Sequence, residues 1–390
     1  MATQKGVWNL QQVRDKELQD LWNYSAPGGD AGELYTWGYN ANGNLGVNDT
    51  NSGYSSPTQV PGTTWVQLGD GTGYSKNPLA VKSDGTLWTW GSDYYGSLGL
   101  NEESVKYSSP TQIPGTTWAY VACGQQSNAA TKTDGTLWVW GRNEYGSTGS
   151  NNRTNYSSPI QIPGTDWAVD GANKLATGYL QTGAIKTDGT LWVWGYGTWG
   201  TLAQNTGGNP AHRSSPVQVP GTTWRSIKMG ENNAFATKTD GTLWGWGRNQ
   251  AGELGLNADN PGISSPTQIP GTWSINVDIA GFSLLVASDG TLWGMGENSY
   301  GATGSGDRVK YSSPVQVGSD TTWSKVSVGR YESSAVKTDG TLWSWGDNDY
   351  AGQLGHNNTT RYSSPVQIGS ATNWVATVAG FETPNMGIRA

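Results

Sequence analysis

Short stretches with alternating apolar and polar positions return along the chain with a period of about 50 residues. A Leu–Trp pair opens such a stretch six times, and Leu34–Tyr35 supplies a seventh, degenerate copy. A Ser-Ser-Pro triplet and a Trp that follows a turn also occur seven times each, at the same period. Three independent markers therefore indicate seven structural units. The Leu–Trp pairs begin at Leu87, Leu137, Leu191, Leu243, Leu292 and Leu342.

Each unit is predicted to contain four short strands. In the third unit these strands are residues 118–124, 130–132, 136–141 and 159–162. Asp-Gly between the second and third strands favours a tight hairpin with positive φ at both central residues. Pro-Gly-Thr after the fourth strand predicts another turn. Seven four-stranded units of this kind predict an all-β fold, a seven-bladed β-propeller.

The two ends of the chain are predicted to share one blade. The first unit offers strands at 33–38 and 57–60 but no earlier pair, whereas 374–380 and 387–389 read as two strands without successors. A hybrid blade built from both ends would leave no open sheet edge. Strand alternation then places the Asp-Gly turns, the Pro-Gly-Thr turns and both termini of the propeller on one side, the tight-turn face. The varied loops between strands one and two and between strands three and four lie on the opposite side, the loop face, where binding is expected.

The stretches "LWTWGSDYYGSLGLN" (87–101) and "LWGWGRNQAGELGLN" (243–257) resemble the regulator of chromosome condensation (RCC1-like) repeat. The resemblance covers residues 31–390 and implies a seven-bladed propeller. The family's usual His before strand two is missing, since residues 124–132 read "GQQSNAATK". No nucleotide-exchange residues are therefore carried over from the family, because function resides in sites rather than folds.

Residues 1–30 form a separate segment in which residues 7–22 have the spacing of an amphipathic helix. This helix could pack on its own propeller or dock on another copy or a larger assembly, and a disordered segment is a third possibility. The string "GVWNLQQVRDKELQDLW" resembles N-terminal segments of bacteriophage structural proteins, which implies docking. The predicted docking residues are Val7, Trp8, Leu10, Val13, Leu18, Leu21 and Trp22.

The residues that most resemble catalytic groups recur with the repeat. The Lys and Asp of "KTDGTLWVWG" return in most units, so we interpret them as strand-end and hairpin residues rather than as an active site. The paired Trp residues of strand three, such as Trp88 and Trp90, share one side of the strand and are predicted to pack between blades. One Cys, Cys123, and two His residues offer no thiolate zinc site, and no phosphate-binding or calcium loop is present. We expect no cofactor, no metal and no catalysis.

Charge and hydropathy narrow the range of partners. The formal net charge of −7 disfavours nucleic acid, and no run of about 18 apolar residues predicts a membrane span. The start of the chain has no secretory leader pattern. Aromatic residues in the varied loops are instead predicted to contact a protein or a glycan. They are Tyr74, Tyr94, Tyr95, Tyr145, Tyr179, Trp199, Phe282, Tyr300, Tyr331 and Tyr350.

Together these features favour a non-enzymatic structural or binding protein. The leading hypothesis is a bacteriophage virion component, attached to other virion proteins or to copies of itself through residues 7–22, with its variable loops facing outward. The alternative is a soluble RCC1-like protein-binding regulator or inhibitor. The corresponding locations are the virion or the bacterial cytoplasm.

Overall fold

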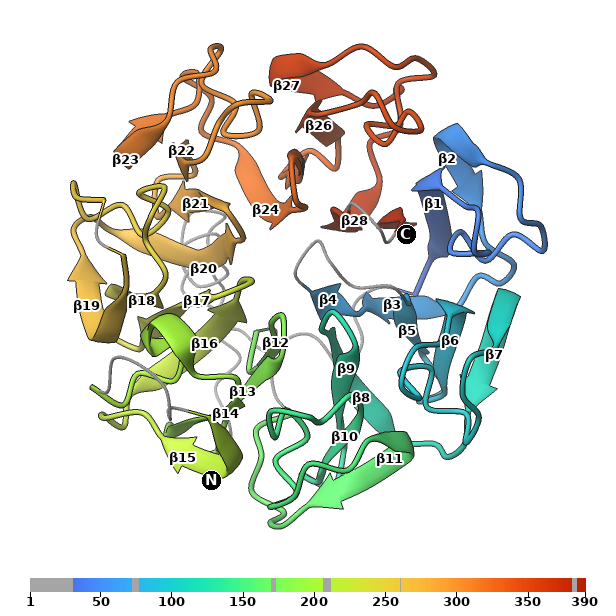
Figure 1. The fold of residues 1–390 in the computed structure, drawn as a ribbon. Helices are drawn as coiled ribbons and strands as arrows, with labels where there is room; N and C mark the ends of the chain where they lie inside the picture. The colour runs from blue at the N-terminus through green and yellow to red at the C-terminus, as the bar shows by residue number, and fades with distance from the viewer. Residues whose placement is uncertain (1–30, 72–76, 170–172, 206–211, 260, 381–383) are drawn as a thin grey trace, which may run out of the picture.

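Seven antiparallel sheets surround a central axis in the computed structural model, which describes residues 31–71, 77–169, 173–205, 212–259, 261–380 and 384–390 (Figure 1). Six sheets follow one another in the chain, and each begins at the axis and ends at the rim. The prediction of an all-β, seven-bladed propeller is confirmed. The one short helix among the described residues is the 3-10 turn η1 (Thr198–Gly200).

Blades 2 to 7 each contain four consecutive strands of the repeat. Blade 2 has β3 (Trp65–Leu68), β5 (Leu79–Lys82), β6 (Leu87–Ser92) and β7 (Lys106–Ile113). Blade 3 has β8 (Trp118–Cys123), β9 (Ser127–Lys132), β10 (Leu137–Gly141) and β11 (Tyr156–Ile162), with β4 (Asp70–Gly71) added in parallel to β8. Blade 4 has β12 (Leu175–Thr177), β13 (Gln181–Ile185), β14 (Leu191–Gly195) and β15 (Arg213–Gln218).

The remaining three consecutive blades follow the same order. Blade 5 has β16 (Trp224–Met229), β17 (Asn233–Lys238), β18 (Leu243–Gly247) and β19 (Ile263–Ile269). Blade 6 has β20 (Trp273–Ile279), β21 (Phe282–Ala287), β22 (Leu292–Gly296) and β23 (Tyr311–Gln316). Blade 7 has β24 (Trp323–Val328), β25 (Glu332–Lys337), β26 (Leu342–Gly346) and β27 (Tyr362–Gln367).

Blade 1 closes the ring with strands from both ends of the chain. Its order is β2 (Gly53–Gln59), β1 (Glu33–Tyr39), β29 (Asn385–Arg389) and β28 (Trp374–Val378), which confirms the predicted hybrid blade (Figure 1). Strand β29 lies between β1 and β28, and Leu34 pairs with Ile388 in the register. The last residue, Ala390, donates its backbone N–H to the Asn373 carbonyl, so the C-terminus lies at the tight-turn face as predicted. The predicted helix at 7–22 lies outside the described residues.

The Ser-Ser-Pro marker joins neighbouring blades. In the seam between blades 2 and 3, Asn101 of one long loop donates its backbone N–H to the Ser157 carbonyl of the next blade at 2.7 Å. Ser158 completes the contact by donating its hydroxyl to the Asn101 side chain. Gly96 of the same loop has φ +76°, and a Cβ there would lie 2.4 Å from the Ser157 Cα, so this close approach requires glycine. The Asn357–Ser55 contact repeats the bond across the ring closure.

The second Trp of each strand three forms the centre of the interblade core. Trp90, Trp140, Trp194, Trp246 and Trp345 are fully buried. Each of them donates its indole Nε1–H to a backbone carbonyl of the preceding blade, a contact that we call the indole latch. The first Trp of each pair is half-buried. In blade 2 both members of the pair, Trp88 and Trp90, contact the strand-one Trp65, which confirms that they share one side of the strand.

The Asp-Gly hairpins differ from the predicted turn. Among the described residues, the glycines have positive φ, as in Gly85 at +77°, whereas their preceding Asp residues do not. Gly85 donates its N–H to the Lys82 carbonyl, and Lys82 donates to the Thr86 carbonyl, the pattern of a three-residue loop with a left-handed glycine. The Asp84 carboxylate accepts bonds from the N–H and hydroxyl of Thr86, and these bonds stabilise this turn without positive φ at Asp. Equivalent bonds occur at Asp134, Asp188, Asp240, Asp289 and Asp339.

Candidate functional site

A pocket of about 180 Å³ opens on the loop face where blades 5, 6 and 7 meet. The loops between strands one and two and the long loops between strands three and four supply its walls, because both kinds of loop leave the sheets on this side. The pocket combines aromatic, cationic and anionic side chains. Its polar and aromatic lining residues are Glu231, Arg248, Phe282, Glu297, Ser299, Tyr300, Arg330 and Tyr331.

Two tyrosine rings at this site each have an arginine guanidinium stacked on them. The rings of Tyr300 and Tyr331 lie 4.6 Å apart between centroids and are tilted by 38°. The guanidinium of Arg330 lies 4.9 Å from the Tyr331 ring, and that of Arg361 lies 4.9 Å from the Tyr300 ring. Arg361 also forms an ion pair with Asp347 at 2.6 Å. A planar guanidinium stacked on an aromatic ring is held rigidly, as in a preorganised binding surface.

Buried carboxylates lie beneath this surface. Burial raises the pKa of Glu332 to about 8, and the nearby negative charge of Asp347 adds to this shift. Burial also raises the pKa of Glu253, although Arg248 opposes that shift from 3.9 Å. Because Glu332 keeps its proton near neutral pH, its carboxyl group does not neutralise the positive charge of Arg330. The site therefore presents arginine guanidinium groups stacked on tyrosine rings, above buried carboxyl groups whose pKa values are raised.

The other predicted loop aromatics lie in smaller groups around the same face. Tyr95 and Tyr94 are 43% and 41% exposed, and Arg142 stacks on the Tyr95 ring at 5.0 Å. Tyr350, which is 59% exposed, contacts Tyr39 with ring centroids 5.1 Å apart. These groups lie on different blades, so the structure does not bring all the predicted residues into one site.

Three further predicted residues have different settings. Tyr145 contacts Tyr196 and His212, whose rings stack on each other at 4.9 Å. Tyr179 is half-buried and interacts with Arg142. Trp199 is half-buried in η1 and has φ +64°.

Phe282 is more deeply buried than the other predicted loop aromatics that the structure describes, although it lines the pocket. Phe282 opens strand β21, is 1% exposed and packs in the core of blades 6 and 7, so little of its ring can reach a partner. Its position directly after Gly281 at a loop end made it look like a loop residue in the sequence. Tyr74 and the predicted docking residues at 7–22 lie outside the described residues.

A buried ionic cluster in the central channel was missed by the sequence analysis. The Asp278 carboxylate accepts hydrogen bonds from the backbone of Val328 at 2.9 Å and from the Ser327 hydroxyl at 3.2 Å. Burial raises the pKa of Asp278 and lowers the pKa of Lys228, while their mutual attraction opposes both shifts. These side chains come from the innermost strands of successive blades, so no local sequence signal brings them together. Because Asp278 is held by hydrogen bonds from blade 7, we interpret the cluster as a link between blades.

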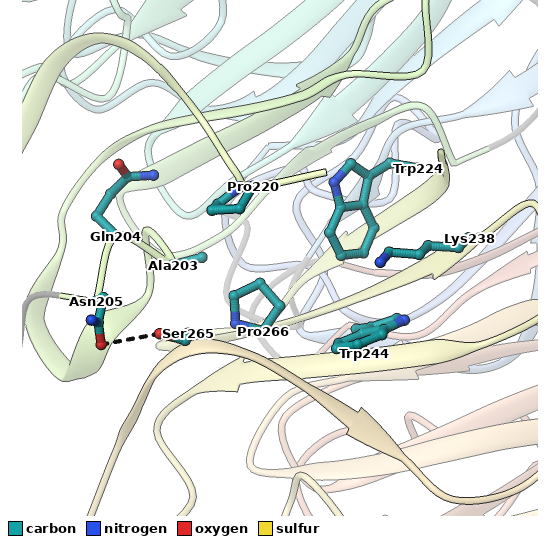
Figure 2. A pocket seen from close by; sticks show the side chains of 9 residues that line it. All are labelled: Ala203, Gln204, Asn205, Pro220, Trp224, Lys238, Trp244, Ser265 and Pro266. Atoms are coloured by element: carbon teal, nitrogen blue, oxygen red, sulfur yellow. Dashed lines mark hydrogen bonds between the residues drawn. The ribbon is translucent and has the colours of Figure 1, made fainter. Parts of the chain in front are cut away.

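The tight-turn face carries a second recurring arrangement, the Lys–Trp cage. In blade 5 the Lys238 ammonium lies between two indole rings, 4.9 Å from the Trp224 centroid and 4.2 Å from the Trp244 centroid (Figure 2). The cage forms one end of a pocket of about 360 Å³ in the seam between blades 4 and 5, and Pro220 and Pro266 lie further along it (Figure 2). Cages of the same kind surround Lys82, Lys132, Lys186 and Lys337.

The cage explains why the repeated lysine follows the fold. Strand two ends at the lysine, which pairs in register with the Trp that opens strand one, as Lys238 does with Trp224. The neighbouring Trp244 is fixed by its own indole bond to Thr242 at 2.8 Å. Cation–π attraction between these groups stabilises the blade and leaves the ammonium fixed between two rings, an unsuitable setting for a nucleophile. Across the described residues, no group of three His, Cys, Asp or Glu side chains is placed to hold a metal ion.

Comparisons with known proteins agree with this geometry. A family model described as an RCC1-like domain matches residues 75–383, and a model of the regulator of chromosome condensation (RCC1) repeat matches residues 31–75. The chain belongs to the RCC1-like domain family. Within the part of this RCC1-like domain that the structure describes, no helix has the length and apolar character needed to cross a membrane.

Two curated relatives share part of their length with this RCC1-like domain. The Ultraviolet-B receptor UVR8 of Arabidopsis thaliana is 28% identical over 230 residues, which are 58% of this chain and 51% of the receptor. The E3 ubiquitin-protein ligase HERC2 of Homo sapiens is 28% identical over 234 residues, 59% of this chain and 5% of the ligase. The alignments thus span about half of the receptor and a small part of the ligase.

Solved structures show the same fold at lower identity. Yeast RCC1 (Prp20), in its crystal structure bound to Kap60, superposes with a TM-score of 0.82 at 18% identity, covering 100% of this chain and 96% of that chain. Human WBSCR16 superposes with a TM-score of 0.78 at 17% identity, covering 92% of this chain and 99% of that chain.

These relatives correct the functional hypothesis drawn from the sequence. The curated relatives are a plant receptor and a human ubiquitin ligase, and they contradict the hypothesis of a bacteriophage virion component. The similarity of the N-terminal segment to bacteriophage proteins is likewise not shown. The alternative, an RCC1-like protein-binding regulator, agrees better with these findings. The localisation is not tested by them, and the cytoplasmic alternative stays a prediction.

Proposed function

We propose that this RCC1-like domain is a non-enzymatic module that binds and regulates a protein partner through its loop face at blades 5 to 7. The observation that carries the proposal is the Tyr300–Tyr331 pair with a guanidinium stacked on each ring. Tyr and Arg dominate the energetics of many protein interfaces, because they offer large contact area with few rotamers to immobilise. The relatives support a regulatory reading, since their names describe a receptor and a ubiquitin ligase.

The charge pattern of the site favours a protein over a glycan on this face. Arg248 and Arg330 line the pocket together with Glu231 and Glu297, so cationic and anionic groups alternate within a small area. A protein surface can complement both signs, whereas a neutral sugar would leave several charges desolvated. The mixed charge also argues against nucleic acid, which requires a continuous cationic surface.

A crosslinking experiment followed by affinity measurement tests this proposal. A photoreactive phenylalanine analogue in place of Tyr331 would covalently capture the partner that contacts the pocket, which mass spectrometry then identifies. With that partner in hand, Tyr331→Ala and Arg330→Ala are expected to weaken binding at least about tenfold each, as for interface hot spots. Tyr350→Ala is the matched control, because Tyr350 is an exposed tyrosine of the same face outside the pocket.

The result that would overturn the proposal is equally specific. If the partner's affinity is unchanged by Tyr331→Ala and Arg330→Ala, while the variants fold normally, the pocket is not the binding site. Equal losses in the Tyr350→Ala control would also contradict a site centred on the Tyr300–Tyr331 pocket, because Tyr350 lies outside that pocket.

A further inference from the structure

Blade 6 lacks the cation that the other blades hold between aromatic rings on the tight-turn face. The strand-two position that pairs with the strand-one Trp is a lysine in blades 2, 3, 4, 5 and 7. In blade 1 the same position is Arg389. In blade 6 that position is Ala287, which pairs with Trp273. A methyl side chain cannot reach the space between the rings, so this blade keeps an aromatic pair without its own cation.

The aromatic pair of blade 6 keeps the geometry of the filled cages. The Trp273 and Trp293 rings lie 6.1 Å apart between centroids at an interplanar angle of 87°. The matching pair of blade 5, Trp224 and Trp244, lies 6.3 Å apart at 82° around its lysine. As in blade 5, the second ring is fixed by an indole bond, here from Trp293 to Thr291 at 2.9 Å. Trp273 is held as well, because its indole N–H bonds the Pro270 carbonyl at 3.2 Å. The two rings therefore already stand at the mutual distance and angle of a filled cage, which lowers the cost of ordering them around a cation.

Exposure and charge at this aromatic pair differ from those of the filled cages. Trp273 is 8% exposed, the highest value among the seven strand-one Trp residues, whereas Trp224 beneath its lysine is 2% exposed. Trp293 is half-buried. The turn carboxylate of Asp289 stands at the same end of the blade, and no lysine contributes to its lowered pKa, unlike its counterpart Asp240. The face thus offers two indole rings and a carboxylate to a positive charge.

We propose that Trp273 and Trp293 form a receptor site for a lysine side chain of a partner protein, which would insert where the other blades carry their own cation. The six filled positions in the same ring define the chemistry of the missing occupant, a primary ammonium or guanidinium on a flexible apolar stem, and lysine predominates among them. The site lies on the opposite face from the proposed loop-face contact. Either proposal can therefore fail without affecting the other.

The test uses the full chain with fluorinated tryptophan and the lysine side-chain analogue n-butylammonium chloride as the probe. The fluorine resonances of Trp273 and Trp293 are assigned by Trp→Phe replacement and followed by NMR at constant ionic strength. We expect saturable shifts at these two resonances with n-butylammonium and none with n-butanol, its neutral analogue. Ala287→Lys, which supplies an internal cation, should abolish the response.

Two further variants keep the test decisive. Ala287→Met fills the same space without charge and should also abolish the response, which covers the case in which Ala287→Lys does not fold. Lys238→Ala opens the matching cage of blade 5 and should add responses at Trp224 and Trp244. The proposal is overturned if n-butylammonium shifts neither Trp273 nor Trp293, whether or not the opened cage responds. It is also overturned if the shifts persist in both Ala287 variants.

Discussion

The closing strand β29 allows the strongest test of how the ring is held together. Ile388 is fully buried at the junction of blades 1 and 2, in a cluster with Leu34, Val60 and Trp65. Ile388→Ala removes three carbon atoms, which at about 0.8 kcal/mol per buried methylene gives about 2.4 kcal/mol from hydrophobic transfer. The neighbouring strands are fixed by their ladders and cannot collapse into the cavity, so the total loss should reach about 3–4 kcal/mol.

Urea unfolding followed by tryptophan fluorescence measures this loss. The matched control is Val375→Ala on the adjacent strand β28, because Val375 is 36% exposed and its truncation should lower the free energy of unfolding by less than about 1 kcal/mol. A loss at Ile388→Ala no larger than the control would refute a closing strand that is packed into the shared core. Removing residues 385–390 should go further, since it exposes the edges of β1 and β28 and should cause oligomers in size-exclusion chromatography.

Three more predictions concern single residues. Glu332→Gln should flatten the pH dependence of the free energy of unfolding. Folding raises the pKa of Glu332 from 4.5 to about 8. The protonated carboxyl therefore contributes its full stabilisation below pH 4.5, and this stabilisation is lost as the pH rises through 8. Unfolding midpoints from pH 4 to 9 that change in parallel for variant and wild type would contradict this. Gly241→Ala should cost about 1–2 kcal/mol through its φ of +83° alone. Gly135→Ala should lower the free energy of unfolding clearly more, because at a similar φ its Cβ would lie 2.2 Å from the Thr165 carbonyl oxygen. Urea unfolding of both variants measures the difference, and equal losses would argue against close packing at this seam. Hydrogen bonds from Thr136 lower the pKa of the exposed Asp134. Asp134→Asn should therefore lower the free energy of unfolding by less than about 1 kcal/mol at pH 7 and by progressively less below pH 4. Urea unfolding midpoints at pH 7 and below pH 4 measure this difference.

The sequence predicted the blade number, the strand order and the ring closure, because these depend on local period and on turn residues within each unit. It could not predict what joins the blades. Asn101 contacts Ser157, and Trp140 bonds to the Ser97 carbonyl, across a seam between two units. Each of these markers was visible, yet its partner lies about one repeat away, and no spacing within a unit reveals it.

The candidate site could be predicted only in part, because contacts between different loops and strands are not visible in the spacing within one unit. Tyr300 and Tyr331 were identified as loop aromatics, but the arginines that stack on them were missed. Arg330 directly precedes Tyr331 in its loop, whereas Arg361 reaches Tyr300 from another blade. The Lys–Trp cages were also missed, because Trp224 and Lys238 meet only once strands one and two pair. Phe282 was predicted as a loop aromatic, but it is the first residue of a strand and is almost fully buried, because its position next to a glycine does not reveal where the strand begins.

The indole latch has a consequence for how the ring would come apart. Blade 6 carries Met295 at the position where the other blades have the buried Trp, so the seam between blades 5 and 6 has neither the indole bond nor the indole ring. The Trp37 indole of blade 1 also makes no such bond, but its ring still packs against Val336 and Leu342 of blade 7. A closed ring shares thermal stress among all its seams, and it separates first where the bonds between neighbours are fewest. Amides of β18 and β22 should accordingly exchange hydrogen through a local separation, ahead of global unfolding. A chain cut in the short link between β19 and β20 would then yield two complementary fragments that meet at this weakly bonded seam.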